Sequence, residues 1–229
     1  TSAGLGRLAG RADPDTYDHG FLHCDVLVIG AGASGLMAAL TAGRAGLRVL
    51  LADEDFRLGG RLNAETDEID GMAGSEWAES SVAELRALPN VRILPRTTVY
   101  GAFDHGIYGA LERKSDLLAD ADGKPRQVLW RVYSQRAILC AGATERSIAF
   151  GNNDRPGIML AGAVRTYLNR FGVTPGKRVA VFTNNSSGLR TALDLEDMGG
   201  EVVRIVDTRV GDVVVDTSGR HGTTAVSLN

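Results

Sequence analysis

A glycine-rich turn between an apolar strand and a helix is the feature that most constrains the fold of this chain. The run 25–29 (DVLVI) is rich in valine and isoleucine, which is typical of a buried parallel strand. Three glycines follow in the spacing G-x-G-x-x-G: Gly30, Gly32 and Gly35. A helix rich in Ala, Leu and Met is predicted over 34–45, and a second apolar strand over 47–52. This order is that of a βαβ unit in a Rossmann-type fold.

Each glycine of this turn has its own physical reason in a dinucleotide site. Gly30 allows the tight turn, Gly32 lets a pyrophosphate approach the backbone, and Gly35 lets helix and strand pack closely. The free N–H groups and the positive dipole end of the helix that begins near Ser34 then face the phosphates. The alternative is a doubly wound fold in which the turn is only structural.

An acidic residue ends the second strand of this unit. Asp53 lies 18 residues after Gly35, where a carboxylate accepts the hydroxyl groups of an adenosine ribose and repels a 2′-phosphate. The sequence therefore favours NAD or FAD over NADP. Further along, Gly59 and Gly60 permit close backbone approach to the same dinucleotide. Arg61 is a candidate contact for its phosphate or ribose, with a plain loop as the alternative.

The bulk composition excludes several classes of protein. The 229 residues allow one large domain or two small ones, and 44% hydrophobic with 23% charged residues is ordinary for a globular protein. The net charge of −3 gives no indication of nucleic acid or an anionic membrane surface as a partner. No apolar run reaches the ~20 residues of a membrane span. No secretory signal is visible, so a cytoplasmic location is expected.

The ends of the chain and its cysteines carry further expectations. Residues 1–20 are Gly-rich and polar, and we predict a linker there. The chain begins without Met and ends in sequence that reads as strand and turn (213–229), so we expect a fragment of a longer polypeptide. Cys24 and Cys140 are predicted to be buried free thiols in a reducing compartment.

The middle of the chain is predicted to form a helix and an inserted β-meander. The helix covers 75–88, with Ser75 as its N-cap. Its packed side comprises four apolar residues: Trp77, Val82, Leu85 and Leu88. A short strand (91–94) precedes the meander. Three β-like runs form the meander: 97–103, 107–112 and 127–133. A returning strand over 137–140 then leads to Gly142, where small residues let the backbone pass close to a bound nucleotide.

The βαβ pattern recurs in the last third of the chain. The predicted elements are, in order, helix 159–171, strand 178–182, helix 189–198 and strand 201–206. Thr183 and Asn185 stand where the first unit has glycine, and side chains there crowd a pyrophosphate, so we interpret this unit as a degenerate structural repeat. We expect a dinucleotide-binding domain over 21–172, with the meander inserted at about 95–135, and part of a second domain over 173–229.

These elements together resemble the two-dinucleotide-domain flavoprotein fold, whose familiar members are the pyridine nucleotide–disulfide oxidoreductases. The expected fold class is thus α/β and Rossmann-like, with an inserted β-meander and a truncated second nucleotide domain. The members that reduce disulfides carry a cysteine pair soon after the Gly-Gly segment or in the second nucleotide domain. Neither place has one in this sequence, so dithiol chemistry is not expected.

A closer resemblance extends over nearly all of residues 15–209. The segments 23–30 (HCDVLVIG), 95–101 (PRTTVYG) and 152–170 are similar to the alpha subunits of heterotetrameric sarcosine oxidases. So is the Thr-Asn-Asn turn that begins at Thr183. This turn and the stretch Asn-Asn-Asp-Arg-Pro-Gly in the third segment are specific to that group and to close relatives such as amino-acid and opine dehydrogenase alpha subunits.

The resemblance implies an activity and a set of cofactors. In that family the complex oxidises sarcosine to glycine, with formaldehyde or methylenetetrahydrofolate and hydrogen peroxide as products. FAD is bound by the beta subunit, covalent FMN lies at the alpha–beta interface, and NAD is bound by the first nucleotide fold of the alpha subunit. Gamma and delta subunits complete the heterotetramer. The family's folate-binding C-terminal domain and its small N-terminal domain have no counterpart in these 229 residues.

The resemblance also implies which residues bind NAD. They lie in the glycine turn, at the acidic strand end and in the loop after it: Gly30, Gly32, Ala33, Ser34, Gly35, Asp53, Glu54, Asp55, Arg61 and the backbone near Val99. Two alternatives stay open, an FAD-binding alpha subunit of an amino-acid or opine dehydrogenase and a non-catalytic scaffold that its nucleotide stabilises. No catalytic or metal site is assigned. The four histidines are scattered and have no visible partner: His19, His23, His105 and His221.

Overall fold

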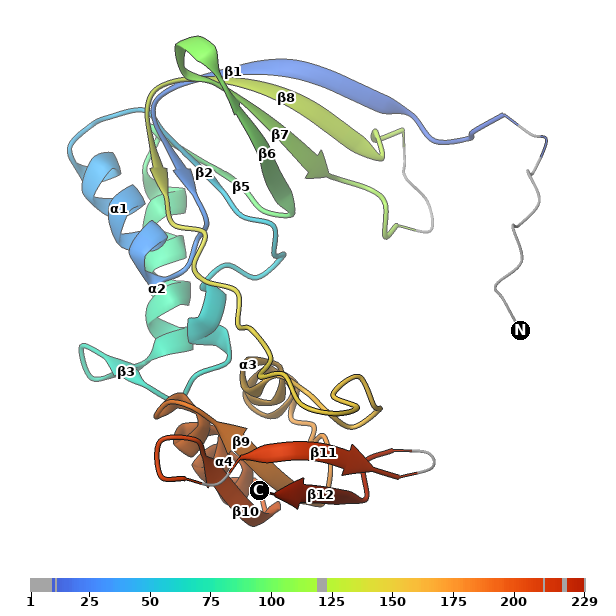
Figure 1. Ribbon diagram of the computed structural model, residues 1–229. Helices are drawn as coiled ribbons and strands as arrows, with labels where there is room; N and C mark the ends of the chain where they lie inside the picture. Colours follow the sequence, from blue (N-terminus) through green and yellow to red (C-terminus); the bar gives the residue numbers. More distant parts are fainter. Residues whose placement is uncertain (1–9, 11, 119–122, 212, 220–221, 229) are drawn as a thin grey trace.

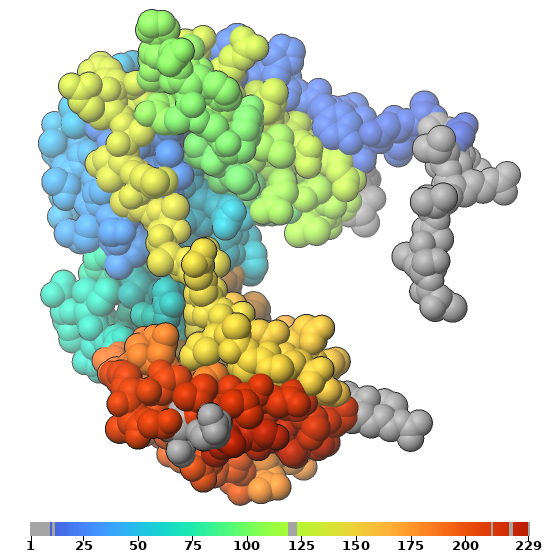
Figure 2. Space-filling model, viewed as in Figure 1, coloured from blue at the N-terminus to red at the C-terminus, as the bar shows by residue number. Residues whose placement is uncertain are grey.

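The computed structural model describes residues 10, 12–118, 123–211, 213–219 and 222–228, which form two units joined by one connecting segment (Figure 1). The first unit (12–139) is built on a six-stranded sheet and the second unit (161–228) on a pair of parallel strands. The connecting segment (140–160) has no helix or strand. The space-filling view shows that the molecule is hollowed on the side where the two units face each other (Figure 2).

Four parallel strands form the core of the first unit. In order across the sheet, they are β5 (Val91–Leu94), β2 (Val49–Ala52), β1 (Tyr17–Ile29) and β8 (Gln127–Leu139). The antiparallel strands β7 (Ile107–Arg113) and β6 (Thr97–Phe103) extend the sheet beyond β8. Val28 packs in the hydrophobic cluster on one face and Leu27 in the cluster on the other. Because both faces are buried, the strands read as continuous apolar runs.

Two helices cover one face of this sheet, α1 (Ala33–Arg44) and α2 (Gly74–Ala87) (Figure 1). The cluster between them and the sheet contains Leu36, Leu51 and Trp77, among others. Ala110 of β7 and Val132 of β8 belong to the cluster on the opposite face, which the meander helps to bury. The remaining short elements are η1 (Gly60–Asn63), β3 (Glu68–Ile69), β4 (Met72–Ala73) and η2 (Asp104–Gly106).

The second unit repeats the βαβ order on a smaller scale. Its elements are α3 (Ala161–Arg165), η3 (Thr166–Arg170), β9 (Arg178–Thr183), α4 (Ser187–Asp197), β10 (Glu201–Asp207), β11 (Val214–Ser218) and β12 (Ala225–Leu228). β9 and β10 pair in parallel, and β11 and β12 form an antiparallel hairpin. Its own hydrophobic cluster comprises Val164, Leu168, Val181, Ala192 and Leu195.

The α/β, Rossmann-like fold predicted from the sequence is confirmed. Apart from β1, the strands and helices of both βαβ units begin and end within two residues of their predicted bounds. The helix predicted over 159–171 is shorter and changes type, because α3 continues as the π-helix η3. A π-helix has hydrogen bonds between residues i and i+5 and often marks a functional site.

Two strands are longer than predicted. β1 begins at Tyr17, so the linker predicted over 1–20 overlaps a strand, and its residues 1–9 and 11 lie outside the described part of the chain. β8 is one strand of 13 residues, whereas the sequence predicted separate strands over 127–133 and 137–140. The reason is that β1 and β8 pair from Tyr17–Gln127 to Ile29–Leu139, and this pairing holds the polar stretch between the predicted strands in extended form.

The start of α2 also differs from the prediction. Ser75 is not the N-cap, because the helix begins at Gly74 and Ala73 takes the N-cap position without a side-chain hydrogen bond. The N–H of Gly74 instead donates to the carbonyl oxygen of Asp67 (3.0 Å), which ties the helix start to the β3–β4 hairpin. The predicted packed side is otherwise right: Trp77, Val82 and Leu85 are buried, and Leu88 is half-buried against them.

Candidate dinucleotide site

The glycine turn connects β1 to α1 at the edge of the sheet where β1 and β2 end. Gly30 has a left-handed φ of +98°, and a side chain there would overlap the carbonyl oxygen of Cys140. A side chain on Gly35 would overlap the carbonyl oxygen of Gly30. Apart from Gly32 itself and its chain neighbours, no atom of the described residues lies within 4 Å of where a Cβ of Gly32 would be. Two of the glycines therefore allow backbone packing, whereas Gly32 leaves open space for a ligand.

The N-terminus of α1 borders this open space. Gly32 is the N-cap, and no side-chain hydrogen bond caps the helix among the described residues. The first bond within the helix runs from the N–H of Leu36 to the carbonyl oxygen of Gly32 (2.9 Å). The N–H groups of Ala33, Ser34 and Gly35 precede it and have no partner within the helix. These groups and the helix dipole favour a negative charge, as a pyrophosphate would supply.

Asp53 lies beside the turn, at the end of β2. Its Oδ2 accepts the N–H of Ala31 (2.5 Å), and its Oδ1 accepts the N–H of Asp55 (2.8 Å). Its backbone bonds to the neighbouring strands, donating to Leu94 O (3.1 Å) and accepting from the N–H of Thr97 (2.7 Å). A carboxylate has about four acceptor positions, so two hydrogen bonds leave capacity for ribose hydroxyls. Sequence reasoning missed that this carboxylate also holds the glycine turn.

Asp53→Ala is expected to destabilise the nucleotide-free protein as well as weaken dinucleotide binding. The N–H of Ala31 would lose its partner, which costs about 1–3 kcal/mol of unfolding free energy. Urea unfolding measures this cost, and the matched control is Glu54→Ala, an exposed neighbour for which a change within about 0.5 kcal/mol is expected. Equal stability of the two variants would contradict the turn-holding role.

Asp55 is engaged by the second unit. The guanidinium of Arg170 donates two hydrogen bonds to this carboxylate, Nη1 to Oδ2 at 2.6 Å and Nη2 to Oδ1 at 3.0 Å. These bonds hold the pKa of Asp55 below its usual range, against the smaller opposing effect of its partial burial. Glu54, by contrast, is exposed, and its carbonyl oxygen accepts a hydrogen bond from Arg113 Nη2 (3.1 Å).

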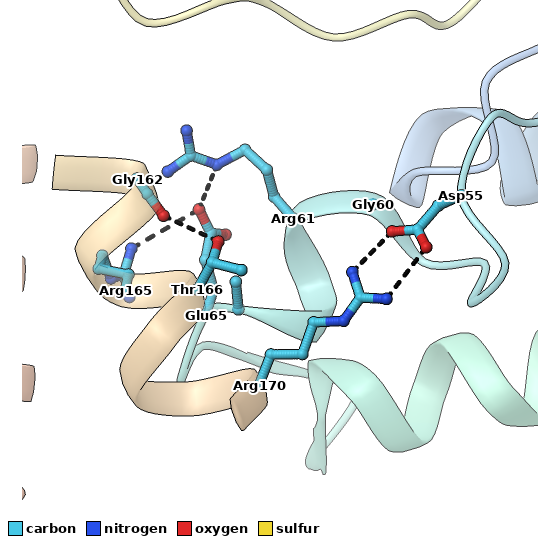
Figure 3. Close-up of a pocket in the computed structure, with 9 residues that line it drawn as sticks. Asp55, Gly60, Arg61, Glu65, Gly162, Arg165, Thr166 and Arg170 are labelled. Carbon is cyan, nitrogen blue, oxygen red and sulfur yellow. Dashed lines mark hydrogen bonds and ion pairs between the residues drawn. The ribbon is translucent and has the colours of Figure 1, made fainter. Parts of the chain in front are cut away.

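The Gly-Gly loop packs against the glycine turn. The N–H of Gly59 donates to the carbonyl oxygen of Ala31 (2.9 Å), and a Cβ on Gly60 would lie 3.0 Å from Gly32 Cα. Arg61 follows, with Nε bonded to Glu65 Oε1 (2.7 Å). A cavity of about 290 Å³ opens here between the units (Figure 3). It is lined by Asp55, Gly60, Arg61, Ala64, Glu65, Gly162, Arg165, Thr166 and Arg170.

The last two predicted positions lie on other elements. Val99 is half-buried in β6, two residues after Thr97, whose N–H bonds to Asp53. Gly142 is exposed in the connecting segment, whereas Cys140 just before it packs against Gly30. The structure therefore brings the glycine turn, residues 53–55 and the Gly-Gly loop together at one sheet edge, the usual place of a nucleotide in such folds.

The equivalent turn of the second unit is filled by its own side chains. Asn185 Oδ1 accepts the N–H of Ser187 (2.9 Å) at the start of α4. Thr183 Oγ1 donates to the carbonyl oxygen of Asn185 (2.8 Å), and a Cβ on Gly188 would lie 2.5 Å from Thr183 Cβ. The N–H of Ser187 at the start of α4 is thus already bonded to a side chain, whereas no side-chain hydrogen bond caps the start of α1 among the described residues.

The remaining polar candidates that the structure describes are dispersed over the chain. His23 stacks on Tyr133 with ring centroids 5.0 Å apart, and His105 lies in the η2 turn. His221 lies outside the described residues. Cys24 is a buried free thiol whose pKa is raised by burial, but Cys140 is only half-buried, contrary to the prediction. Within the described part of the chain, no group of His, Cys, Asp and Glu could hold a metal, and no helix is long and apolar enough to cross a membrane.

Comparison with known proteins identifies relatives of the chain. The FAD dependent oxidoreductase family matches residues 25–93, which include the glycine turn and Asp53. Sarcosine oxidase subunit alpha from Rhizobium meliloti (strain 1021) is 50% identical over 209 residues, covering 91% of this chain and 21% of that protein. This chain is a homologue of sarcosine oxidase subunit alpha. The same subunit from Corynebacterium sp. (strain P-1) is 46% identical over 209 residues, covering 90% of this chain and 22% of that protein.

The homologous region is a small part of sarcosine oxidase subunit alpha, since the chain spans about a fifth of the length of these curated relatives. Among solved structures, the crystal structure of L-proline dehydrogenase from P. horikoshii has a TM-score of 0.73 to this chain at 24% sequence identity. The match covers 95% of this chain and 41% of that chain. It supports the same fold for this subunit alpha homologue.

Proposed function

We propose that this chain is the dinucleotide-binding part of a sarcosine oxidase alpha subunit and that it binds NAD. The observation that carries the proposal is the 50% identity to a sarcosine oxidase subunit alpha over 91% of the chain. The complete enzyme would be a cytoplasmic heterotetramer with beta, gamma and delta subunits. It would oxidise sarcosine to glycine, releasing hydrogen peroxide with formaldehyde or methylenetetrahydrofolate. Its FAD would be bound by the beta subunit and its covalent FMN would lie at the alpha–beta interface.

The residues at the sheet edge fit a dinucleotide. The pyrophosphate would lie over Gly32, against the N–H groups of Ala33, Ser34 and Gly35, because that helix end is uncapped and open. The adenosine ribose would bond to Asp53. The adenine side of the site would be bordered by two further predicted positions, Glu54 and Val99, and Arg61 and Gly142 are the proposed contacts of the other half.

The volume of the cavity and its charged lining favour NAD over FAD as the ligand. At about 290 Å³ it is just below the ~300–1,000 Å³ of a typical ligand site, and five of its nine lining residues are charged. A nicotinamide ring is smaller and more polar than the three-ring isoalloxazine of FAD. When bound, NAD supplies a hydride-accepting ring. The residues of this chain bind and orient it, and ligand bound only to the folded state stabilises that state by mass action.

A second candidate is an FAD-binding alpha subunit of an amino-acid or opine dehydrogenase. The observation that favours it is the match to the FAD dependent oxidoreductase family, which covers the glycine turn and the acidic strand end. The same residues would hold the ADP half of FAD, so the two candidates share the site and differ in the second half of the ligand.

The test is to release the bound nucleotide by heat from the protein isolated with its natural partners, separate the chains, and identify the nucleotide by absorption and mass. Colourless NAD recovered in a one-to-one ratio with this chain is the expected result. FAD recovered from this chain would favour the second candidate. A chain that carries no nucleotide, and takes up neither NAD nor FAD when they are added, would contradict both.

A further inference from the structure

The two units meet through polar groups. Asn169 Nδ2 donates to the carbonyl oxygen of Ala64 (2.9 Å), and Arg190 pairs with Asp67. No hydrophobic cluster of the described residues combines side chains of both units. Interfaces of this polar kind leave the relative position of two units open to change unless specific contacts hold them. The individual ion pairs between the units are therefore the contacts that can fix the position of the second unit relative to the site.

Arg170 makes a two-point contact between the units. It comes from the π-helix η3 and forms the two-point pair with Asp55, with its side chain only 11% exposed (Figure 3). Its guanidinium also lies over the ring of Phe56, 4.9 Å from the centroid. A planar guanidinium that is paired at two points and stacked on a ring is fixed in orientation.

A chain of hydrogen bonds links this arginine to the glycine turn. Arg170 donates to the Asp55 carboxylate, the N–H of Asp55 donates to the Asp53 carboxylate, and that carboxylate also accepts the N–H of Ala31. The Asp55 carboxylate further accepts the N–H of Arg57 (3.2 Å). The start of the loop between β2 and the Gly-Gly segment is thus bonded to the glycine turn through Asp53 and to the second unit through Asp55.

Arg170 also reduces the negative charge at this edge of the sheet. Asp53, Glu54 and Asp55 are three consecutive carboxylates beside the place proposed for an anionic pyrophosphate. Like charges this close raise the free energy of binding an anion. Arg170 neutralises the third of them through a short, partly buried pair, and the pKa of Asp55 is lowered accordingly.

We infer that Arg170 is a positioning residue of the dinucleotide site, supplied by the second unit and acting through Asp55. This inference rests on the proposed function. It means that the second unit, whose own nucleotide turn is filled, completes the site of the first unit from across the cavity. Dinucleotide binding and the docking of the two units are then thermodynamically coupled, so that each favours the other.

The test compares NAD binding by two arginine variants in the protein isolated with its natural partners. Arg170→Met is expected to weaken NAD binding about tenfold or more, the range for loss of a charged, two-point hydrogen-bonded pair. Arg190→Met is the matched control, because Arg190 also pairs across the units but with Asp67, which does not bond to the residue 53–57 loop. It is expected to bind NAD as the unchanged protein does.

Two further variants separate positioning from simple loss of structure. In an Asp55→Asn background, Arg170→Met should cause no additional loss of NAD affinity, because the arginine acts through that carboxylate. Arg170→Lys keeps the positive charge but not the two-point geometry. Its affinity for NAD should therefore lie between those of the unsubstituted protein and Arg170→Met.

Unchanged NAD affinity in Arg170→Met, or equal and independent losses in both backgrounds, would overturn the inference. If the protein without any substitution bound neither NAD nor ADP, the proposed function itself would be overturned.

Discussion

Replacing Gly32 by valine is expected to abolish dinucleotide binding in a chain that still folds. Gly32 has ordinary extended dihedrals (φ −70°, ψ −174°), so a side chain brings no backbone strain. Apart from the chain neighbours of Gly32, an added Cβ meets no atom of the described residues within 4 Å, so the side chain extends into the space proposed for the pyrophosphate. We expect affinity for NAD to fall by on the order of 100-fold or more, equivalent to about 2.7 kcal/mol.

The measurement is the nucleotide content of the purified variant and its affinity for added NAD, followed by thermal unfolding without nucleotide. Gly176→Val is the matched control, because Gly176 also has open surroundings, with Arg178 O at 4.0 Å as its nearest neighbour, and lies in the loop before β9. Gly35→Ala is expected to lower the thermal stability of the nucleotide-free protein, because its Cβ would overlap the carbonyl oxygen of Gly30. Full nucleotide content in Gly32→Val would place the ligand elsewhere.

The largest effect on stability is expected from Asp194→Ala. Asp194 Oδ2 accepts hydrogen bonds from Arg165 Nε (2.6 Å) and Asn169 Nδ2 (2.9 Å), and the side chains of the ion pair are 4% and 6% exposed. Removing the carboxylate leaves a buried guanidinium with its nearest remaining carboxylate at Glu65, 3.6 Å away. A buried charge that loses its partner costs about 3–5 kcal/mol, a large part of the ~5–15 kcal/mol that holds a typical protein folded.

Denaturant unfolding of the nucleotide-free protein measures this loss. The double variant Arg165→Met with Asp194→Leu is expected to be more stable than Asp194→Ala alone, because both buried charges are then gone. Asp67→Ala serves as the control, since it breaks an exposed ion pair with Arg190 and should cost less than about 1 kcal/mol. Equal losses of unfolding free energy in Asp194→Ala and Asp67→Ala would contradict a larger contribution of the buried ion pair to stability.

The parts of the site that the sequence predicted are those encoded locally. The glycine turn and Asp53 fall within one βαβ unit, where residue type and spacing follow from the strand–turn–helix geometry. Arg170 could not be predicted in the same way, because it pairs with a residue 115 positions earlier. No spacing rule connects residues that meet only when two units dock.

The errors in the fold have similar causes. The polar Ser-Gln-Arg stretch within β8 broke the apolar pattern, and its pairing with β1, distant in sequence, kept it extended. Ser75 looked like an N-cap by residue type, but a hydrogen bond from Gly74 to Asp67 set the helix start one residue earlier. In each case a contact from outside the segment decided between local options of similar energy.

The pairing of β1 with β8 has a mechanical consequence. Thirteen residues at about 3.3 Å each give a two-stranded ribbon that is roughly 40 Å along its contour and bends sharply between its ends (Figure 1). The glycine turn is attached to one end, and the exposed rings of Tyr17 and Phe21 lie at or near the other. A protein that bound those rings would contact the same two paired strands that carry the glycine turn, and would act on the nucleotide through these strands rather than by direct contact.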